Sequence, residues 1–164
     1  MKISDLYKIF NNHPNVTTDT RNIKENSIFF ALKGDNFNGN KFARKAIKDG
    51  CHYAIIDQAE FQLNEKYILV DDVLKCLQNL ATYHRDQIMI PVIGITGTNG
   101  KTTSKELIYS CLSTELNTLA TDGNYNNHIG VPLTLLRVKK EHDIAIIEMG
   151  ANHENEIKYL LSLI

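Results

Sequence analysis

The hydrophobic positions of this chain fall into two kinds of segment. Short, nearly continuous apolar runs predict buried β-strands, and they cover residues 27–32, 53–57, 67–70, 92–96 and 143–149. Segments with apolar residues three and four apart predict amphipathic helices, and they cover residues 3–10, 41–49, 71–84, 101–114 and 154–164. Weaker strand patterns lie at residues 16–21 and 118–121. Because strands and helices alternate, the pattern predicts an α/β fold.

Residues 85–91 connect two regions of this pattern. Pro91 disfavours helical conformation in the residue before it and suits the start of a new strand. The sequence therefore predicts a small α/β domain over residues 1–84 and a second, parallel-sheet domain over residues 85–164. The second region offers about three strands, whereas nucleotide-binding sheets have about five or six. We expect a fragment of a longer protein, with a sheet completed by a partner as the alternative.

Two segments rich in asparagine and glycine fit neither pattern. KGDNFNGN, at residues 33–40, predicts a wide loop. GNYNNHIGVPLT, at residues 123–134, has too many asparagines and glycines for a regular element and too many apolar residues for a disordered linker. It predicts an ordered loop that runs into a short helix at Pro132.

Composition and charge narrow the class of protein. The formal net charge is −1 and no long run of like charge occurs, so charge gives no reason to expect nucleic acid or an anionic membrane as a partner. No apolar run approaches the ~20 residues of a membrane span, and Asp5 and Lys8 interrupt the apolar core that a signal peptide needs. We expect a cytoplasmic protein in which Cys51, Cys76 and Cys111 are reduced, mostly buried thiols.

The stretch VIGITGTNGKTT, at residues 92–103, has the clearest chemical meaning. It opens as a strand, turns through Gly97 and Gly100, and places Lys101 at the start of a helix. Glycines let backbone N–H groups converge on phosphate oxygens, the helix N-terminus and Lys101 add positive charge, and a following threonine hydroxyl can hold Mg²⁺. Ile95 stands where the strict P-loop pattern has glycine, so this is a variant phosphate loop. The alternative is a glycine-rich turn without a ligand.

Three further polar residues are candidates for the same site. Glu148 ends an apolar strand, and the C-terminal edge of parallel strands is where open α/β sheets bind ligands. Its alternative is an N-cap or a surface carboxylate. Asn126 and Asn127 follow a glycine-rich turn, and their amides can donate and accept hydrogen bonds around a sugar or a peptide. The alternative for both asparagines is a turn that their own side chains stabilise.

Four motifs, in this order along the chain, resemble the Mur ligase family, the ATP-dependent amide ligases that build the peptide stem of the bacterial cell-wall precursor. TDTRNIKENSIFFALKGDNFNGNKFARKAIKDG resembles the family's N-terminal uridine-nucleotide domain, and TGTNGKTT resembles its ATP loop. NYNNHIGVPLTLL resembles a substrate-side loop of the central domain, and IEMGANHENEI resembles the magnesium-bearing strand with the segment after it. The implied fold is a small N-terminal α/β uridine-nucleotide domain followed by a truncated P-loop-type ATP-binding domain with a parallel sheet.

The resemblance also implies ATP and Mg²⁺ as ligands of the second domain. Lys101 would neutralise the charge that develops in phosphoryl transfer. Thr102 would hold a first Mg²⁺ through its hydroxyl, and Glu148 would hold a second one between ATP and the substrate carboxylate. Lys101 and Glu148 are thus the catalytic candidates. The implied nucleotide-binding set is Gly97, Thr98, Asn99, Gly100, Lys101, Thr102 and Thr103.

Within the family, NNHIGVPLTLLR and EMGANH most resemble the member that adds D-alanyl-D-alanine to UDP-N-acetylmuramoyl-tripeptide through an acyl phosphate. The member that adds the third, diamino acid residue is the alternative. Thr20 and Arg21 would contact the uridine diphosphate, because arginine suits phosphate, and Asn126 and Asn127 would contact the rest of the substrate. The complete enzyme is expected to be a monomer. This chain is expected to be inactive alone, since the family's C-terminal amino-acid-binding domain would fall beyond Ile164.

A few positions depart from the family's pattern. Thr20 stands in place of the serine of a DSR motif and keeps its hydroxyl, whereas residues 38–40 read NGN where DGH is common. The turn glycine is kept there, but the polar contacts beside it change. Asn155 replaces a common glycine, and for His153 a plain loop position is favoured over a place at the metal cleft.

Two other classes of function fit parts of the sequence. A generic P-loop phosphotransferase or ATPase would leave the first 84 residues as an unrelated appendage. A non-catalytic module would hold a UDP-sugar and use the ATP half as a scaffold. Nucleotide hydrolysis without affinity for uridine nucleotides would favour the phosphotransferase or ATPase. A natural gene that ends at Ile164 would favour the non-catalytic module.

Overall fold

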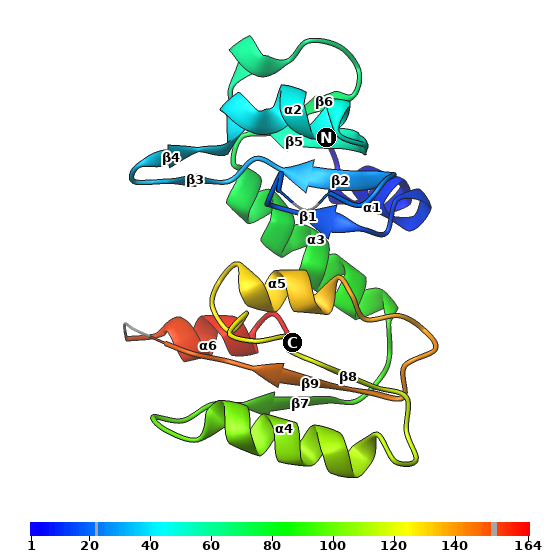
Figure 1. Cartoon of the computed structure of the whole chain (residues 1–164), viewed down its shortest axis with the longest axis vertical. Helices are drawn as coiled ribbons and strands as arrows, with labels where there is room; N and C mark the ends of the chain where they lie inside the picture. The colour runs from blue at the N-terminus through cyan, green and yellow to red at the C-terminus, as the bar shows by residue number, and fades with distance from the viewer. Residues whose placement is uncertain (22, 152–153) are drawn as a thin grey trace. The chain divides into compact units, whose positions relative to one another are not determined.

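The computed structural model describes residues 1–21, 23–151 and 154–164. The chain forms two compact units, Met1–Leu80 and Ala81–Ile164, whose elements are labelled in Figure 1. Helix α3, Val73–Gln87, contributes residues to both. That the chain divides after residue 84 into domains with separate ligands stays a prediction.

A parallel sheet of strand order β1-β2-β5-β6 organises the first unit (Figure 1). All four residues of β2 are buried, as expected for a central strand in a parallel sheet that is covered on both faces. This explains why its sequence SIFF shows no alternation with polar residues. The strands are β1 Val16–Thr17, β2 Ser27–Phe30, β5 Cys51–Ile56 and β6 Tyr67–Leu69.

Helices cover this sheet where the sequence predicts them. Helix α1, Ile3–Asn12, buries Leu6 and Phe10. Helix α2, Ala43–Lys48, buries two alanines and packs against β5 and β2. The predicted helix over residues 41–49 is shorter than expected, because its start is a 3₁₀ turn, η1 Gly39–Phe42. A second 3₁₀ turn, η2 Ala59–Phe61, lies between β5 and β6.

The segment 33–40 is more ordered than the predicted wide loop. It contains an antiparallel hairpin of β3, Lys33–Gly34, and β4, Phe37–Asn38. The Asn38 Oδ1 atom accepts a hydrogen bond from the Asn40 backbone N–H at 3.0 Å, and Asn40 is fully buried. The prediction of a plain loop is therefore wrong, because the asparagines satisfy backbone groups and thereby build a turn.

A second parallel sheet, of order β7-β9-β8, organises the second unit. Figure 1 shows helix α4 on one face of this sheet and α5 on the other. In the register, Ile95 at the end of β7 lies opposite Glu148 at the end of β9. The phosphate loop and Glu148 therefore leave the same edge of the sheet. The elements are β7 Val92–Ile95, α4 Lys101–Leu112, β8 Thr118–Ala120, α5 Gly130–Leu135, β9 Ile144–Glu148 and α6 Glu156–Leu161.

Helix α4 turns a different face to the sheet from the one its apolar residues predict. Leu107 is 68% exposed, Cys111 is exposed, and Ile108 and Leu112 are half-buried. The buried residue of this helix is Lys105. Its ammonium donates a hydrogen bond to the Thr121 carbonyl oxygen, just after β8, at 2.6 Å.

The three cysteines are free, but one of the three is buried, whereas most of them were expected to be. Cys51 is buried, Cys76 is half-buried and Cys111 is exposed. Burial raises the pKa of Cys76 to about 11, so this thiol stays protonated at neutral pH. Among residues 1–21, 23–151 and 154–164, no helix is both long and apolar enough to cross a bilayer.

Candidate functional site

The phosphate loop joins β7 to α4 with its backbone open to solvent. Gly97 has φ 150° and Gly100 has φ 76°, and both values lie in the region that favours glycine. Residues 96–100 are all exposed. Gly100 is the N-cap of α4, and in the part of the chain that is described no side chain caps this helix end. The first backbone N–H groups of α4 are thus placed to receive an anion.

Lys101 is the first residue of α4, and its side chain folds back over the loop. Its Nζ atom donates a hydrogen bond to the Gly97 carbonyl oxygen at 2.7 Å. Thr102 and Thr103 follow in the first helical turn and are exposed. The loop therefore presents an ammonium, two hydroxyls and a helix N-terminus together, which is the set of groups that phosphate and Mg²⁺ require.

Glu148 lies at the end of β9 and is 1% exposed. Its Oε1 atom accepts a hydrogen bond from Asn126 Nδ2 at 2.8 Å. Its Oε2 atom is buried and has no hydrogen-bond partner among the described residues. A buried carboxylate oxygen without a partner is costly, and Mg²⁺ is a hard cation that carboxylate oxygens bind. The position fits a metal ligand, and the binding of Mg²⁺ by Glu148 stays a prediction.

The two predicted substrate asparagines are engaged with the protein itself. The side-chain amide of Asn126 donates a hydrogen bond to Glu148. The backbone carbonyl oxygen of Asn126 accepts from the Gly150 N–H at 2.7 Å. The Asn127 Oδ1 atom accepts from the backbone N–H groups of Ile129 and Gly130, at 3.0 and 2.8 Å. These contacts are those of the alternative, an asparagine-stabilised turn. A role of either residue in substrate binding stays a prediction, and His153 lies outside the described residues.

In the first unit, the predicted uridine contacts lie in the turn after β1. The Arg21 guanidinium pairs with Asp19 through Nη2 at 2.6 Å and holds the pKa of that carboxyl below its usual range. The side chain of Arg21 is 88% exposed. Lys45 Nζ lies 3.5 Å from the Thr20 carbonyl oxygen, so the fold brings a second cation to this turn. Sequence reasoning missed Lys45, because its distance of 25 residues from Thr20 gives no signal.

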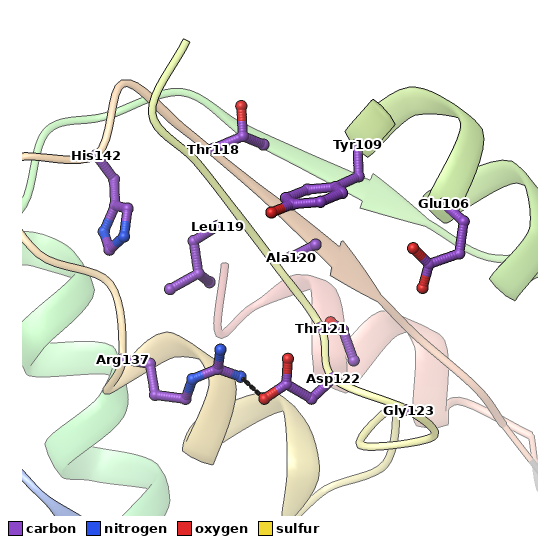
Figure 2. A pocket seen from close by; sticks show the side chains of 10 residues that line it. All are labelled: Glu106, Tyr109, Thr118, Leu119, Ala120, Thr121, Asp122, Gly123, Arg137 and His142. Atoms are coloured by element: carbon purple, nitrogen blue, oxygen red, sulfur yellow. Dashed lines mark ion pairs between the residues drawn. The ribbon is translucent and has the colours of Figure 1, made fainter. Parts of the chain in front are cut away.

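A pocket of about 330 Å³ lies along β8, an edge strand of the second sheet (Figure 2). Arg137 and Asp122 face each other within it and form an ion pair at 2.6 Å. None of the sequence-predicted site residues lines it. The lining residues are Glu106, Tyr109, Thr118, Leu119, Ala120, Thr121, Asp122, Gly123, Arg137 and His142.

Comparison with known proteins supports the sequence motifs. Residues 14–85 match the family model described as Mur ligase family, catalytic domain, and residues 95–164 match the model of the Mur ligase middle domain. The UDP-N-acetylmuramoyl-tripeptide–D-alanyl-D-alanine ligase of Bacillus subtilis is 41% identical over 150 residues, which cover 90% of this chain and 33% of that protein. The ligase of the same name from Escherichia coli is 43% identical over 148 residues, covering 90% and 32%.

Solved structures give the same result. A UDP-N-acetylmuramoylalanyl-D-glutamyl-2,6-diaminopimelate–D-alanyl-D-alanyl ligase from Acinetobacter baumannii superposes with a TM-score of 0.82 at 38% identity, over 91% of this chain and 33% of that one. A MurF ligase from Thermotoga maritima in complex with ADP gives 0.81 at 29% identity, over 99% and 36%. This chain thus spans about a third of the length of the relatives it matches. From the two matched models, the ordered motifs and the shared fold, the chain belongs to the Mur ligase family.

Proposed function

We propose that this sequence carries the UDP-substrate unit and part of the ATP-binding unit of a ligase that adds D-alanyl-D-alanine to UDP-N-acetylmuramoyl-tripeptide. The observation that carries the proposal is the pairing of Ile95 with Glu148, which brings the phosphate loop and a buried carboxylate with an unpartnered oxygen to one sheet edge. Relatives named for this reaction align over about nine-tenths of the chain.

ATP is the proposed nucleotide, and its phosphates would lie on the backbone N–H groups of residues 97–103. Lys101, which bonds to the loop at 2.7 Å, would exchange the Gly97 carbonyl for a phosphate oxygen and neutralise charge as the γ-phosphoryl group moves to the substrate carboxylate. An acyl phosphate would form in this way with ADP as the leaving group. The amine of D-alanyl-D-alanine would then attack the acyl carbon, inorganic phosphate would leave, and the amine nitrogen would lose a proton. The protein contributes mainly position and positive charge.

Thr102 and Glu148 are the proposed ligands of Mg²⁺, each of a separate ion. When bound, Mg²⁺ supplies charge neutralisation and polarises phosphoryl oxygens. Glu148 would bind through Oε2, since Oε1 is held by Asn126. Asn126 thereby fixes the orientation of the carboxylate, which leaves one oxygen for the metal.

The first unit would bind the uridine diphosphate through Thr20 and Arg21. Arg21 is exposed and already in a two-pronged geometry with Asp19, so a diphosphate would compete with that carboxylate for the guanidinium. The complete ligase is proposed to be a monomer. It is proposed to act in the cytoplasm, where its UDP-linked substrate and ATP would both be present.

Calorimetric titration of this chain tests the substrate assignment. The ligands are UDP-N-acetylmuramoyl-tripeptide, the corresponding dipeptide precursor and UDP alone. We expect the tripeptide to bind more tightly than the dipeptide, and Arg21→Ala to weaken all three, while Lys48→Ala on the same unit leaves them unchanged. Preference for the dipeptide would instead indicate the ligase that adds the third residue. Absence of binding by all three would contradict a UDP-substrate site in these residues.

Titration with ATP and Mg²⁺ tests the second unit separately. We expect Lys101→Ala to weaken ATP binding by about tenfold or more, because a charge-assisted contact to phosphate is lost. Lys140→Ala, an exposed lysine of the same unit, is the matched control. Equal ATP affinity in the Lys101→Ala variant and the wild type would overturn the role of the loop.

A further inference from the structure

Lys105 is a buried lysine that the proposed chemistry does not use. Its side chain is 2% exposed, and it lies one helical turn after Lys101 in α4. Its Nζ atom is 2.6 Å from the Thr121 carbonyl oxygen and 2.8 Å from Glu106 Oε1. Lysine is seldom fully buried unless paired, and the only buried side chain that α4 shows in its described length is this one. Because burial of a lysine side chain is energetically costly, the role of Lys105 is to be found in the contacts that it makes.

The acceptor of this hydrogen bond, Thr121, ends the pairing between β8 and β9. Its N–H donates to the Ile146 carbonyl oxygen at 3.0 Å. In a regular parallel ladder the N–H of residue 148 would then donate to the Thr121 carbonyl oxygen. Here the Glu148 N–H donates instead to the Thr121 hydroxyl oxygen at 2.9 Å. The Thr121 hydroxyl thus takes the place of the Thr121 carbonyl as acceptor in the ladder. The Lys105 ammonium donates to the carbonyl instead.

These contacts form one chain of hydrogen bonds that crosses the site. It runs from Lys105 on the phosphate-loop helix to Thr121, from Thr121 to the backbone of Glu148, and from the Glu148 carboxylate to Asn126. Each of these hydrogen bonds joins two segments that are distant from each other in the sequence. Figure 2 shows two of the residues that Lys105 contacts, Glu106 on α4 and Thr121 after β8.

We infer that Lys105 is a positioning residue: its ammonium binds the end of β8 to the phosphate-loop helix and so sets where the Glu148 carboxylate stands relative to that loop. An apolar side chain of the same length would fill the space but leave the Thr121 carbonyl without a donor. The Lys105 charge is balanced by Glu106, whose side chain is 59% exposed and therefore remains partly hydrated.

Amide hydrogen exchange tests the positioning directly. In Lys105→Met, we expect protection in peptides covering residues 121–127 and 148–150 to fall about tenfold or more, because a buried carbonyl loses its donor. Protection in β2 of the first unit should stay unchanged. Lys140→Met removes an exposed lysine from the same unit and is the matched control. No loss in those peptides, or an equal loss in every peptide of the second unit, would overturn the inference.

A double variant distinguishes the proposed exchange of partners from simple destabilisation. Thr121→Val removes the hydroxyl that accepts from the Glu148 N–H, while Lys105 still occupies the carbonyl. In Lys105→Met/Thr121→Val the freed carbonyl can accept that N–H, as in an ordinary ladder. We therefore expect Thr121→Val to lower protection of the Glu148 amide several-fold less in the Lys105→Met background than in the wild type. Equal effects in both backgrounds would contradict the replacement of the Thr121 carbonyl by its hydroxyl as the acceptor.

A nucleotide measurement connects this inference to the proposed function, on which its significance for catalysis rests. ATP affinity is measured with Mg²⁺ and again with a chelator. Lys105→Met should reduce the gain in affinity that Mg²⁺ gives by about tenfold, yet leave the affinity in chelator within about twofold, because the phosphate loop is intact. Loss of both affinities alike would mean a structural role alone. If the wild type binds no ATP, the proposed function fails, and the exchange experiments still decide the role of Lys105.

Discussion

Asp57 in the first unit and Glu148 in the second occupy equivalent places, because each lies at the C-terminal end of a buried parallel strand. The Asp57 side chain is 4% exposed and pairs with Lys33 Nζ at 2.9 Å. Its Oδ1 atom also accepts from Asn40 Nδ2 at 2.9 Å. Glu148 is 1% exposed, but one of its oxygens has no partner among the described residues.

The difference lies in how completely the described residues satisfy each carboxylate. The network around Asp57 is closed: Asn40 both donates to Asp57 and accepts from its backbone N–H, at 3.0 Å, and Lys33 balances the charge. The network around Glu148 is open by one oxygen. Buried polar groups are normally satisfied, and under the proposed function a metal ion beside the phosphate loop would complete this position.

The largest expected effect is on the closed network. Asn40→Ala removes the side chain that satisfies both the Asp57 backbone and its carboxylate, and we expect the first unit to lose about 3 kcal/mol of its free energy of unfolding. Amide hydrogen exchange of β2 and β5 measures this loss. The control is Asn126→Ala in the open network, for which about 1 kcal/mol is expected in the second unit. Equal losses would erase the distinction between the networks.

A smaller effect, which differs between the units, follows from replacing each carboxylate by its amide. Asp57→Asn breaks the pair with Lys33, whose side chain is 47% exposed, and should cost the first unit about 1 kcal/mol. Glu148→Gln replaces a buried carboxylate whose Oε2 atom has no partner among the described residues, so the second unit should become more stable or change by less than about 0.5 kcal/mol. Denaturant unfolding followed by exchange in each unit checks both. A loss of about 2 kcal/mol in Glu148→Gln would mean that its network is already closed.

The smallest effect is a dependence of the second unit on pH. Burial lowers the pKa of His84, although its contact with the Val138 carbonyl oxygen opposes this. In the unfolded chain the imidazole takes up a proton as the pH falls below about 6.5, whereas in the folded chain it does so only at lower pH. The unfolded state therefore binds more protons in that window, and stability falls as the pH falls through it. His84→Gln, which keeps a donor for Val138, should remove this part of the dependence. An unchanged pH profile would contradict it.

Most of the element order could be predicted from the sequence, because the strand and helix patterns are strong in both units. The face of α4 could not. Leu107 and Cys111 suggest an apolar face, but both are exposed. The buried residue is Lys105, and its partner Thr121 lies 16 residues away, which the helical pattern does not reveal. The hairpin at residues 33–38 was also missed, and the hydrogen bond beside it joins Asn40 to Asp57, which lies 17 residues away.

The candidate site divides in the same way. The phosphate loop is local, so Gly97, Gly100 and Lys101 reveal its geometry from the sequence alone. The surroundings of Glu148 are not local, because Thr121 and Asn126 reach it from 27 and 22 residues away. The sequence indicates which carboxylate is at the edge of the sheet, while the packing determines which of its two oxygens remains open.

The open oxygen of Glu148 is tested most directly by counting bound metal. With ATP present and Mn²⁺ standing in for Mg²⁺, electron paramagnetic resonance measures how many ions this chain binds tightly. We predict about two for the wild type and for Asp57→Asn, and about one for Glu148→Gln, since Thr102 keeps its ion. The same number of ions in Glu148→Gln and the wild type would contradict the assignment of Glu148 as a metal ligand.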